Sequence, residues 1–396
     1  MDAGRVCADL VAINSENPPG NTAGIIEYIR EFLDSLGIRS CIMENDGGRC
    51  NLVTPGTGDH LLLCGHVDVV PALDEGWKHP PFSGIIDDQH VWGRGATDMK
   101  GGCAALLSAC EVLIHDGHEL PATLAFVCDE ETGGEYGIRS LIAQDLISPC
   151  DCLIAEPTPA RHPCIGQKGL CRLELKFTGT PGHGSLYPAI GVSAIMEAVS
   201  FLEYIKDLNE REYPVDDQLK EIIRQSSGVF SGEFDMTGGE KILQRLMFNP
   251  GIIRGGEKSN IVAQHCNLDI ELRIPWGCRI ADLLDSIKAH AQHGAIMKET
   301  VHDPSLTDPG CDLVTVVCSE VEKVYRGNVF PIVQWAASDA RHLRVAGFRV
   351  IEYGPGELAT LHGVDERIAI QSIEKASEIY QGVMLAYGKM REMGTK

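Results

Sequence analysis

The chain has 396 residues, of which 44% are hydrophobic and 23% charged, and its formal net charge is -22. This length exceeds that of one ordinary domain, so two domains are expected, and the composition is typical of globular proteins. The acidic charge argues against nucleic acid or an anionic membrane surface as a partner, because phosphate binding needs clustered Lys and Arg.

The cysteine content indicates the cellular compartment. There are 15 Cys residues, and no Cys-x-x-Cys pair occurs among them. Their spacing matches neither a zinc finger nor a redox dithiol, so free thiols in a reducing compartment are expected. Residues 1–5 lack an apolar signal core, and no apolar run approaches the length of a membrane span. These features predict a cytoplasmic protein without a membrane partner.

The first half of the chain alternates strands and helices. Apolar residues recur at helical spacing over 25–36. Strands are then predicted at 51–53, 61–64, 123–128 and 151–155, and helices at 101–114 and 136–144. Such alternation is typical of a parallel sheet covered by helices on both faces.

The pattern changes after about residue 169. Polar and apolar residues alternate over 171–177, as they do in half-buried antiparallel strands. A helix at 191–208, a hairpin of 252–254 with 261–274, a helix at 280–292 and a strand at 296–301 then complete a ferredoxin-like order. No element is predicted between residues 209 and 250, which are charged and irregular.

The first pattern resumes near residue 304, with a helix at 312–325, a strand at 349–352 and a helix at 370–388. We therefore predict an α/β fold with a parallel-core sheet and flanking helices, formed by residues 1–170 and 304–396. Residues 171–303 are predicted to form an inserted ferredoxin-like α+β domain.

Six short segments carry imidazole or carboxylate groups, and the first four of them lie at the ends of predicted buried strands. The candidate side chains are His66, Asp68, Asp98, Glu130, Glu131, Glu156, His183 and His362. In an open α/β sheet, strand ends of this kind converge on one crevice. Ligands from distant parts of the chain can therefore meet there.

Each candidate also has an ordinary structural interpretation. Asp98 precedes a helix, so it is either an N-cap or a carboxylate that bridges two cations with its two oxygens. His66 and Asp68 face the same side of a strand, where the carboxylate can fix the tautomer of a metal-binding imidazole, or the pair is simply solvated. Glu130 and Glu131 face opposite ways if they continue the strand, so one can bind a metal while the other accepts a proton.

Taken together, two His and three carboxylates favour a two-metal hydrolase. This ligand set suits Zn²⁺, with Co²⁺ or Mn²⁺ as alternatives, and does not suit Cu(I) or iron–sulfur clusters. Two cations about 3.5–4 Å apart can share one carboxylate and one water. The sequence has no Gly-x-Ser-x-Gly elbow, no dinucleotide loop and no His-Glu-x-x-His pair.

These motifs resemble the M20 metallopeptidase family, in the branch of acetylornithine deacetylase and succinyl-diaminopimelate desuccinylase. The resemblance rests on Gly65-His66-Val67-Asp68, Gly93-Arg94-Gly95-Ala96-Thr97-Asp98-Met99-Lys100-Gly101-Gly102, Asp129-Glu130-Glu131-Thr132, Ala155-Glu156-Pro157-Thr158, Pro181-Gly182-His183-Gly184-Ser185 and His362-Gly363-Val364-Asp365-Glu366. It implies a zinc-exopeptidase-like fold for the larger domain. For the inserted domain it implies a role as a lid and dimerisation module.

The resemblance also implies roles for single residues. One metal would be held by His66, Asp98 and Glu156, and the other by Asp98, Glu131 and His362. Glu130 would be the general base, Asp68 would support His66, and the peptide bond between Asp98 and Met99 would be cis. His183 would reach the partner's active site across a dimer interface and stabilise the oxyanion. Substrate contacts are implied for Asn260, Arg273, Arg341 and Gly356.

The resulting hypothesis is a two-zinc amidohydrolase of amino-acid biosynthesis that acts as a homodimer. It would remove a succinyl or acetyl group from an N-acyl amino acid such as N-succinyl-diaminopimelate or N-acetylornithine. A dipeptidase or carboxypeptidase that uses the same site is the alternative. A metal-binding protein without catalysis is a further alternative, but such a protein should lack the base or a ligand, and all are present here.

Overall fold

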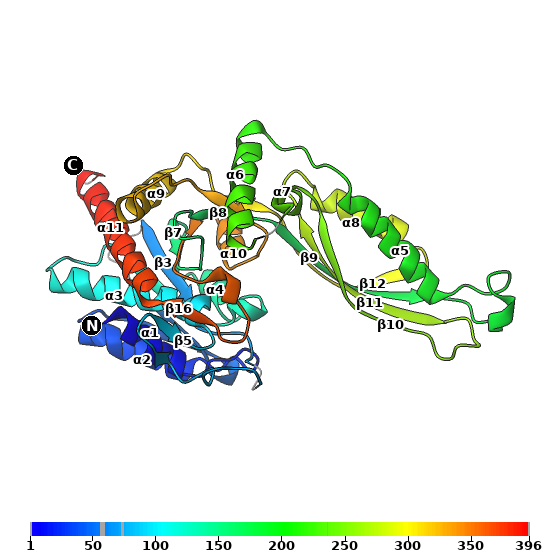
Figure 1. Cartoon of the computed structure of the whole chain (residues 1–396), viewed down its shortest axis with the longest axis horizontal. Helices are drawn as coiled ribbons and strands as arrows, with labels where there is room; N and C mark the ends of the chain where they lie inside the picture. Colours follow the sequence, from blue (N-terminus) through cyan, green and yellow to red (C-terminus); the bar gives the residue numbers. More distant parts are fainter. Residues whose placement is uncertain (1, 56–59, 73–74, 236, 395–396) are drawn as a thin grey trace. The chain divides into compact units, whose positions relative to one another are not determined.

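The computed structural model describes residues 2–55, 60–72, 75–235 and 237–394. The chain forms two compact units (Figure 1). The first unit comprises Met1–Ile165, Leu306–Ile332 and Ser338–Lys396, and the second comprises Gly166–Ser305 and Val333–Ala337. Compared with the predicted division at residues 171 and 303, the second unit begins earlier, ends later and takes in a short segment after residue 332.

The first unit is a mixed α/β structure around a central sheet, so the predicted fold class is confirmed. The strand order is β1 (Cys41–Asn45), β2 (Arg49–Val53), β6 (Thr123–Val127), β3 (Leu61–His66), β7 (Asp151–Ile154), β15 (Arg349–Glu352), β8 (Cys164–Gln167) and β13 (Ser305–Leu306), with β14 (Ile332–Gln334) paired to β8. The four strands β6, β3, β7 and β15 are parallel to one another. They are almost wholly buried because apolar side chains occupy both of their faces.

Antiparallel strands extend this parallel centre. β1 pairs with β2, β2 with β6, and β15 with β8, each in antiparallel fashion. The sheet is therefore mixed rather than wholly parallel. A separate small sheet has the order β16 (Arg367–Ala369), β5 (His90–Trp92) and β4 (Ile85–Ile86).

Helices flank the central sheet, and one of them is almost completely enclosed. They are α1 (Ala3–Ala12), α2 (Ala23–Ser35), α3 (Gly101–His115), α4 (Ile138–Ala143), α9 (Asp312–Tyr325), α10 (Ala340–Val345) and α11 (Ile370–Gly394). The enclosed helix is α3, which contacts α1 and α11. A Cβ atom on Gly102 would lie 2.2 Å from the carbonyl oxygen of Ala155, so only glycine lets the start of α3 approach the end of β7 this closely.

The second unit contains an antiparallel sheet with the order β10 (Met247–Gly255), β11 (His265–Ile274), β9 (Gly169–Thr178) and β12 (Gly294–His302). Helices α5 (Ala194–Asn209) and α8 (Ile280–His290) pack against it. From Cys171 onward every second side chain of β9 is buried, because only one face of the sheet meets the helices. Residues such as Leu175, Phe177 and Phe201 form the shared core. The role of this unit as a lid or dimerisation module stays a prediction.

The region between residues 209 and 250 contains two helices that the sequence pattern did not predict. They are α6 (Asp217–Glu233) and α7 (Gly239–Gln244). The buried stripe of α6 is interrupted by Ser226, which is itself buried. Its hydroxyl donates to the carbonyl of Ile222 at 2.7 Å and accepts from the N–H of Val333 at 3.0 Å. A polar residue in the stripe weakens the helical pattern, although its hydrogen bonds make it acceptable there.

The hairpin of the second unit also differs from its prediction. Its first strand, β10, begins at Met247, before the predicted start, and β11 begins at His265 rather than at residue 261. Ile261 instead forms an isolated bridge with His183. The sequence therefore placed both strands of the hairpin but not their ends, and only β11 alternates buried and more exposed side chains.

The N-terminus of α6 provides a test of this unpredicted helix. The carboxylate of Asp216 accepts a hydrogen bond of 2.8 Å from the N–H of Leu219, as an N-cap does. Replacement of Asp216 by Ala is expected to destabilise α6 by about 1 kcal/mol. Hydrogen exchange of the α6 amides should become about fivefold faster.

The neighbouring Asp217 is the matched control for this prediction. Its side chain is fully exposed and forms only a surface pair of 3.2 Å with Lys220. Surface pairs contribute little, so Asp217→Ala should leave the exchange rates nearly unchanged. Equal effects of the two substitutions would contradict the capping role of Asp216.

The cysteines are free thiols, as the sequence indicates. Most of them are buried, and burial raises the pKa of Cys103 and Cys110 to about 12. These thiols are therefore core residues rather than nucleophiles. Within the described ranges of the chain, no helix has both the length and the apolar character needed to cross a membrane.

Candidate metal centre

The carboxyl ends of three parallel strands bring the first candidate residues together. His66 is the last residue of β3, and β3 lies between β6 and β7 in the sheet. Glu130 and Glu131 follow the end of β6, and Glu156 follows the end of β7. Parallel strands end at the same edge of a sheet, so these side chains reach one place, as the sequence predicts.

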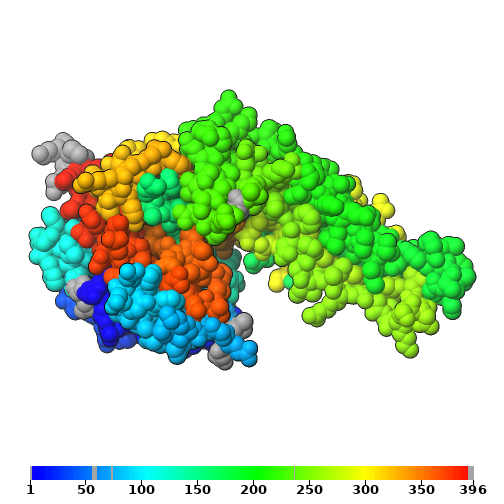
Figure 2. Space-filling view, in the orientation of Figure 1, coloured from blue at the N-terminus to red at the C-terminus, as the bar shows by residue number. Residues whose placement is uncertain are grey.

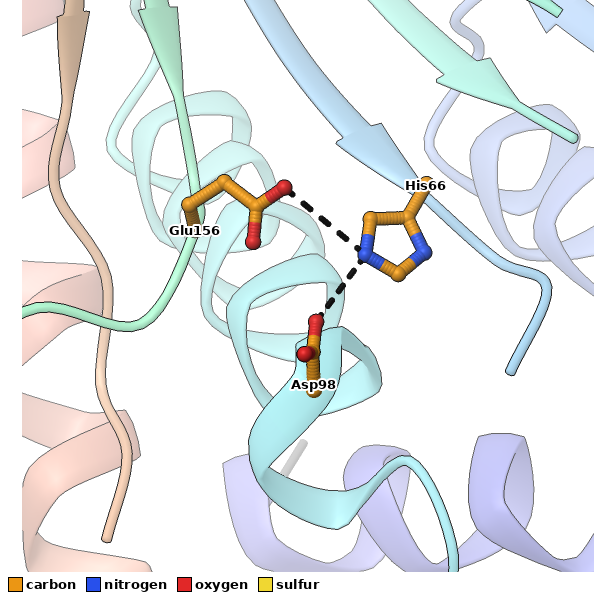
Figure 3. Close-up of side chains that lie close together, drawn as sticks. All are labelled: His66, Asp98 and Glu156. Atoms are coloured by element: carbon orange, nitrogen blue, oxygen red, sulfur yellow. Dashed lines mark hydrogen bonds and ion pairs between the residues drawn. The ribbon is translucent and has the colours of Figure 1, made fainter. Parts of the chain in front are cut away.

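The first group of possible ligands consists of His66, Asp98 and Glu156 (Figure 3). The Nε2 atom of His66 lies 3.0 Å from Oδ1 of Asp98 and 3.8 Å from Oε1 of Glu156. In Figure 3 both carboxylates point toward this nitrogen. The three side chains come from three different segments and converge on one point, which is the arrangement that a metal ion needs.

The second group consists of Asp98, Glu131 and His362. The Nε2 atom of His362 lies 3.2 Å from Oδ2 of Asp98 and 3.6 Å from Oε2 of Glu131. Asp98 therefore belongs to both groups, with Oδ1 toward His66 and Oδ2 toward His362. A carboxylate in this position can bridge two cations.

Asp98 owes its position to an irregular turn. It lies in Ala96–Lys100, directly before α3, and its φ and ψ of -115° and 97° are not helical. The peptide bond between Asp98 and Met99 is cis, as the resemblance implies. Asp98 is thus not an ordinary helix cap, which answers the alternative that the sequence left open.

The candidate ligands have shifted pKa values, because several carboxylates lie close together in a buried place. The hydrogen bonds of His362 with Asp98 and Glu131 raise the pKa of this imidazole to about 10. Burial lowers the pKa of His66, but its hydrogen bond with Asp98 and the charge of Glu156 outweigh burial and raise it well above the ordinary value. Burial also raises the pKa values of Glu131 and Glu156. Protons or cations can supply the missing positive charge.

One buried oxygen indicates that a cation fits this centre. Across the described part of the chain, Oε1 of Glu131 is among the buried side-chain atoms that have no hydrogen-bond partner. A carboxylate oxygen in this state is costly unless something positive binds it. The donors are two imidazole nitrogens and three carboxylates, a set that suits divalent ions such as Zn²⁺. The residues present therefore fit two such ions.

Asp68 supports the centre in a different way from the one expected. The Nδ1 atom of His66 lies 2.9 Å from the main-chain carbonyl oxygen of Asp68 and 3.6 Å from its carboxylate. The carbonyl accepts the Nδ1 proton and leaves Nε2 free to bind a metal. The carboxylate instead accepts the N–H groups of Glu130 at 3.1 Å and Glu131 at 3.3 Å.

Glu130 and Glu131 do not continue the strand, contrary to the sequence interpretation. They lie in a short 3-10 turn, which follows Asp129 with a φ of 69°. The turn directs Glu131 into the second group, while Glu130 belongs to neither group. Burial and the charge of Asp339 raise the pKa of Glu130 well above its ordinary value. A carboxylate with a raised pKa suits proton transfer near neutral pH.

Asn17 was not singled out in the sequence analysis. Its side-chain Nδ2 lies 2.9 Å from Oδ2 of Asp68, 3.1 Å from Oδ1 of Asp129 and 3.1 Å from Oγ1 of Thr132. It therefore ties Asp68 to the turn that carries Glu130. No local pattern around Asn17 predicts contacts with residues so far along the chain.

Two predicted substrate contacts also lie in the first unit. Arg341 is buried in α10, and its Nη1 lies 3.9 Å from Oε1 of Glu130 and donates to the carbonyl of Ser338 at 2.9 Å. A Cβ atom on Gly356 would lie 2.6 Å from Cβ of Pro157 and 2.9 Å from Cγ2 of Thr97. Gly356 therefore packs between the segments that carry Glu156 and Asp98.

The remaining predicted residues, His183, Asn260 and Arg273, lie in the second unit. His183 is exposed. Gly184, which follows His183, donates a hydrogen bond of 2.9 Å from its N–H to the carbonyl of Asn260. Arg273 lies on β11, with its Nε 2.9 Å from Oε1 of Glu271. These three residues are thus on a different unit from the candidate ligands.

The strand ends and the two overlapping groups of possible ligands suit a two-metal hydrolase. The chain belongs to peptidase family M20/M25/M40, whose family model matches residues 62–386. The resemblance of the motifs to this family is thereby confirmed.

Two relatives and one solved structure are similar over nearly the whole chain. Acetylornithine deacetylase of Pasteurella multocida is 29% identical over 371 residues, which cover 90% of this chain and 88% of the relative. Succinyl-diaminopimelate desuccinylase of Helicobacter hepaticus is 28% identical over 387 residues, covering 90% and 91%. The fold matches an M20 family metallo-carboxypeptidase from Sulfolobus solfataricus with a TM-score of 0.79 at 18% identity, covering 98% and 99%.

Proposed function

We propose that the chain is a two-zinc amidohydrolase in which Asp98 bridges the two ions. His66 and Glu156 would complete the first site, and Glu131 and His362 the second. The observation that carries this proposal is the position of Asp98, whose two oxygens face two different imidazoles at 3.0 and 3.2 Å. The donor set also accommodates Co²⁺ or Mn²⁺.

Glu130 is the proposed general base. When bound, the two ions polarise the scissile carbonyl and make water more acidic. Glu130 takes the proton from the attacking water and later passes it to the leaving nitrogen. Its raised pKa suits both transfers, and the hydrogen bond from its own N–H to Asp68 fixes its position.

The proposed substrate is an N-acyl amino acid whose succinyl or acetyl group is released as the free carboxylate. The two relatives with these activities, which match nearly the full length of the chain, support this choice. Arg341 carries a positive charge beside Glu130, where a guanidinium can bind the carboxylate of such a substrate through two parallel hydrogen bonds. The N–H groups around Gly356 are further proposed contacts.

A panel of substrates tests this assignment. The protein loaded with Zn²⁺ or Co²⁺ is assayed on N-succinyl-diaminopimelate, N-acetylornithine, other acylated amino acids and a set of dipeptides. The proposal expects the highest kcat/KM for an acylated amino acid with a free carboxylate. Preferred cleavage of dipeptides would support the exopeptidase alternative, which uses the same centre and is favoured by the description of the family as peptidases. Metal uptake without hydrolysis of any compound would revive the non-catalytic alternative.

We also propose that the second unit forms a homodimer and supplies His183 to the partner's centre. Large apolar side chains are exposed near His183, namely Leu186, Tyr187, Ile190, Met196 and Ile261, each between 38% and 55%. In Figure 2 the segment before α5 and the connection between β10 and β11 meet at the surface of this unit. Residues of these two segments line a pocket of about 520 Å³. An exposed apolar surface of this kind favours association.

The tautomer of His183 supports its proposed role. Its Nδ1 accepts a hydrogen bond of 3.3 Å from the N–H of Ser185, so the neutral ring carries its proton on Nε2. That N–H can donate to an oxyanion.

The free thiols further support a reducing compartment, and we propose the cytoplasm as the location.

The dimer proposal predicts a defined result for an apolar substitution. Ile190→Asp places a charge on the exposed apolar surface, and light scattering should then show monomers with much lower activity. Exposed Leu146 of the first unit provides the control, because Leu146→Asp should change neither mass nor activity. A parent protein that is a fully active monomer would remove the proposed role of His183.

A further inference from the structure

A buried ion pair contacts the main chain of two residues of the candidate metal centre. The side chain of Glu366 is 1% exposed, and that of Arg94 is 4% exposed. Their atoms Oε2 and Nη1 are 2.6 Å apart. Neither residue belongs to a ligand group, so the pair has no direct role in the function proposed above.

The carboxylate of this pair binds the main chain of Asp98, the proposed bridging residue. The Oε1 atom of Glu366 accepts hydrogen bonds of 3.0 Å from the N–H of Thr97 and 3.0 Å from the N–H of Asp98. Asp98 lies in an irregular turn, where a helix does not provide partners for these N–H groups. Glu366 therefore fixes the backbone from which the bridging carboxylate projects.

The other side of the pair holds the main chain of His362. The Nη2 atom of Arg94 donates to the carbonyl oxygen of His362 at 3.2 Å. The guanidinium also lies 5.3 Å from the centre of the Trp77 ring. The same ion pair thus connects Asp98 with His362, two residues that are far apart in the chain and adjacent in the second ligand group.

The two ligand groups need this connection to different degrees. His66 ends a buried strand and is 2% exposed, and the Glu156 side chain is 11% exposed, so packing and the sheet position them. The His362 side chain is 52% exposed. His362 lies in a loop, and its own φ is 57°. Because packing constrains His362 less, the tie to its carbonyl has more influence on where its imidazole lies.

We propose that Glu366 and Arg94 are positioning residues that set the affinity of the second metal site. The inference rests on the proposed function, since it takes Asp98, Glu131 and His362 to be ligands. Loss of the pair loosens His362 and the turn of Asp98, while His66 and Glu156 keep their places on the sheet. The second site then weakens much more than the first.

The test compares cation binding by the parent and by Glu366→Gln, with Co²⁺ alone as the probe. Outer groups that orient ligands typically affect metal affinity by about 10–100-fold. We therefore expect two tight Co²⁺ ions in the parent. In the variant we expect one tight ion and one that binds about 10–100-fold more weakly, in competition with a chelating dye. Excess Co²⁺ should restore kcat, with KM nearly unchanged, which a general loss of structure would not allow.

A second variant separates positioning from the cost of an unpaired buried charge. Glu366→Gln leaves the Arg94 charge without its partner, which destabilises a folded chain. The double variant Arg94→Met with Glu366→Gln removes both charges, so its thermal stability should recover. Its second Co²⁺ site should nevertheless stay weak, because the double variant lacks the guanidinium that donates to the carbonyl of His362.

The control is Asp151→Asn. Asp151 is also a buried carboxylate paired with an arginine, Arg349, but it lies at the opposite end of β7 from Glu156. Both Co²⁺ affinities should stay at the parental values in this variant. If Glu366→Gln and the double variant also bind two Co²⁺ ions within about twofold of the parent, this inference is wrong and the proposed function stands. A parent that binds fewer than two ions would instead overturn the proposed function, and this inference with it.

Discussion

Replacement of Glu130 by Gln is expected to lower kcat by about 10²–10⁴-fold, the usual contribution of a general base. Gln has nearly the same size as Glu but cannot accept a proton from water. Glu130 belongs to neither ligand group, so both cations should remain bound in the variant. Single-turnover assays together with measurement of bound metal would separate loss of the base from loss of the ions.

Two neighbours of Glu130 serve as controls. Glu135 is exposed and follows the same turn, so Glu135→Gln should leave kcat unchanged. Glu131→Gln should instead lose the second cation, because Glu131 is in the second group. If Glu130→Gln retained activity within tenfold of the parent, another residue would have to move the proton.

Replacement of Asp98 by Asn should have the widest effect, because Asp98 belongs to both groups. The neutral amide lacks the charge and the second carboxylate oxygen that a bridge needs. We expect both cations to bind weakly and kcat/KM to fall at least about 10³-fold, since metal ions contribute several kcal/mol to such reactions. Chelation of the parent protein should cause the same loss, and added Zn²⁺ should reverse it only in the parent.

The control for Asp98 lies at the other end of the same helix. Asp116 is exposed and follows α3, whereas Asp98 precedes it. The Asp116→Asn variant should therefore bind both cations and hydrolyse substrate as the parent does. Retention of two tightly bound cations by Asp98→Asn would exclude the bridging role, even if the activity of that variant were low.

The central sheet was predictable because its parallel strands have apolar residues on both faces. β3 and β6 appear in the sequence as continuous apolar runs, and the convergence of their ends follows from the fold class alone. The long helices α3 and α9 were found for a similar reason, since each has a clear apolar pattern. Features that depend on local periodicity were therefore accessible from the sequence.

Other elements depend on contacts that no local pattern records. The polar Ser226 interrupts the apolar stripe of α6, and one of the two hydrogen bonds that satisfy it comes from the distant Val333. The short strands β5 and β16 pair residues near 91 with residues near 368, and neither is long enough to show alternation. Such elements become visible only when the whole chain is folded.

The candidate site shows the same division. The possible ligands were found because their types and their places after strands were informative. The residues that hold them, Asn17, Arg94 and Glu366, act through hydrogen bonds to distant segments, and their neighbours in sequence give no sign of this. The assignment of Glu130 and Glu131 to different roles also depended on the family resemblance, because both lie in a turn whose geometry begins at Asp129.

The divided first unit has a consequence for synthesis on the ribosome. His66, Asp98, Glu131 and Glu156 all emerge before the second unit is made, whereas His362 belongs to the last part of the chain. Domains generally fold as units, so the first unit can complete its fold only after about two hundred further residues beyond Glu156 have been made. A product cut short before residue 362 would contain only the first group of possible ligands, His66, Asp98 and Glu156, in full.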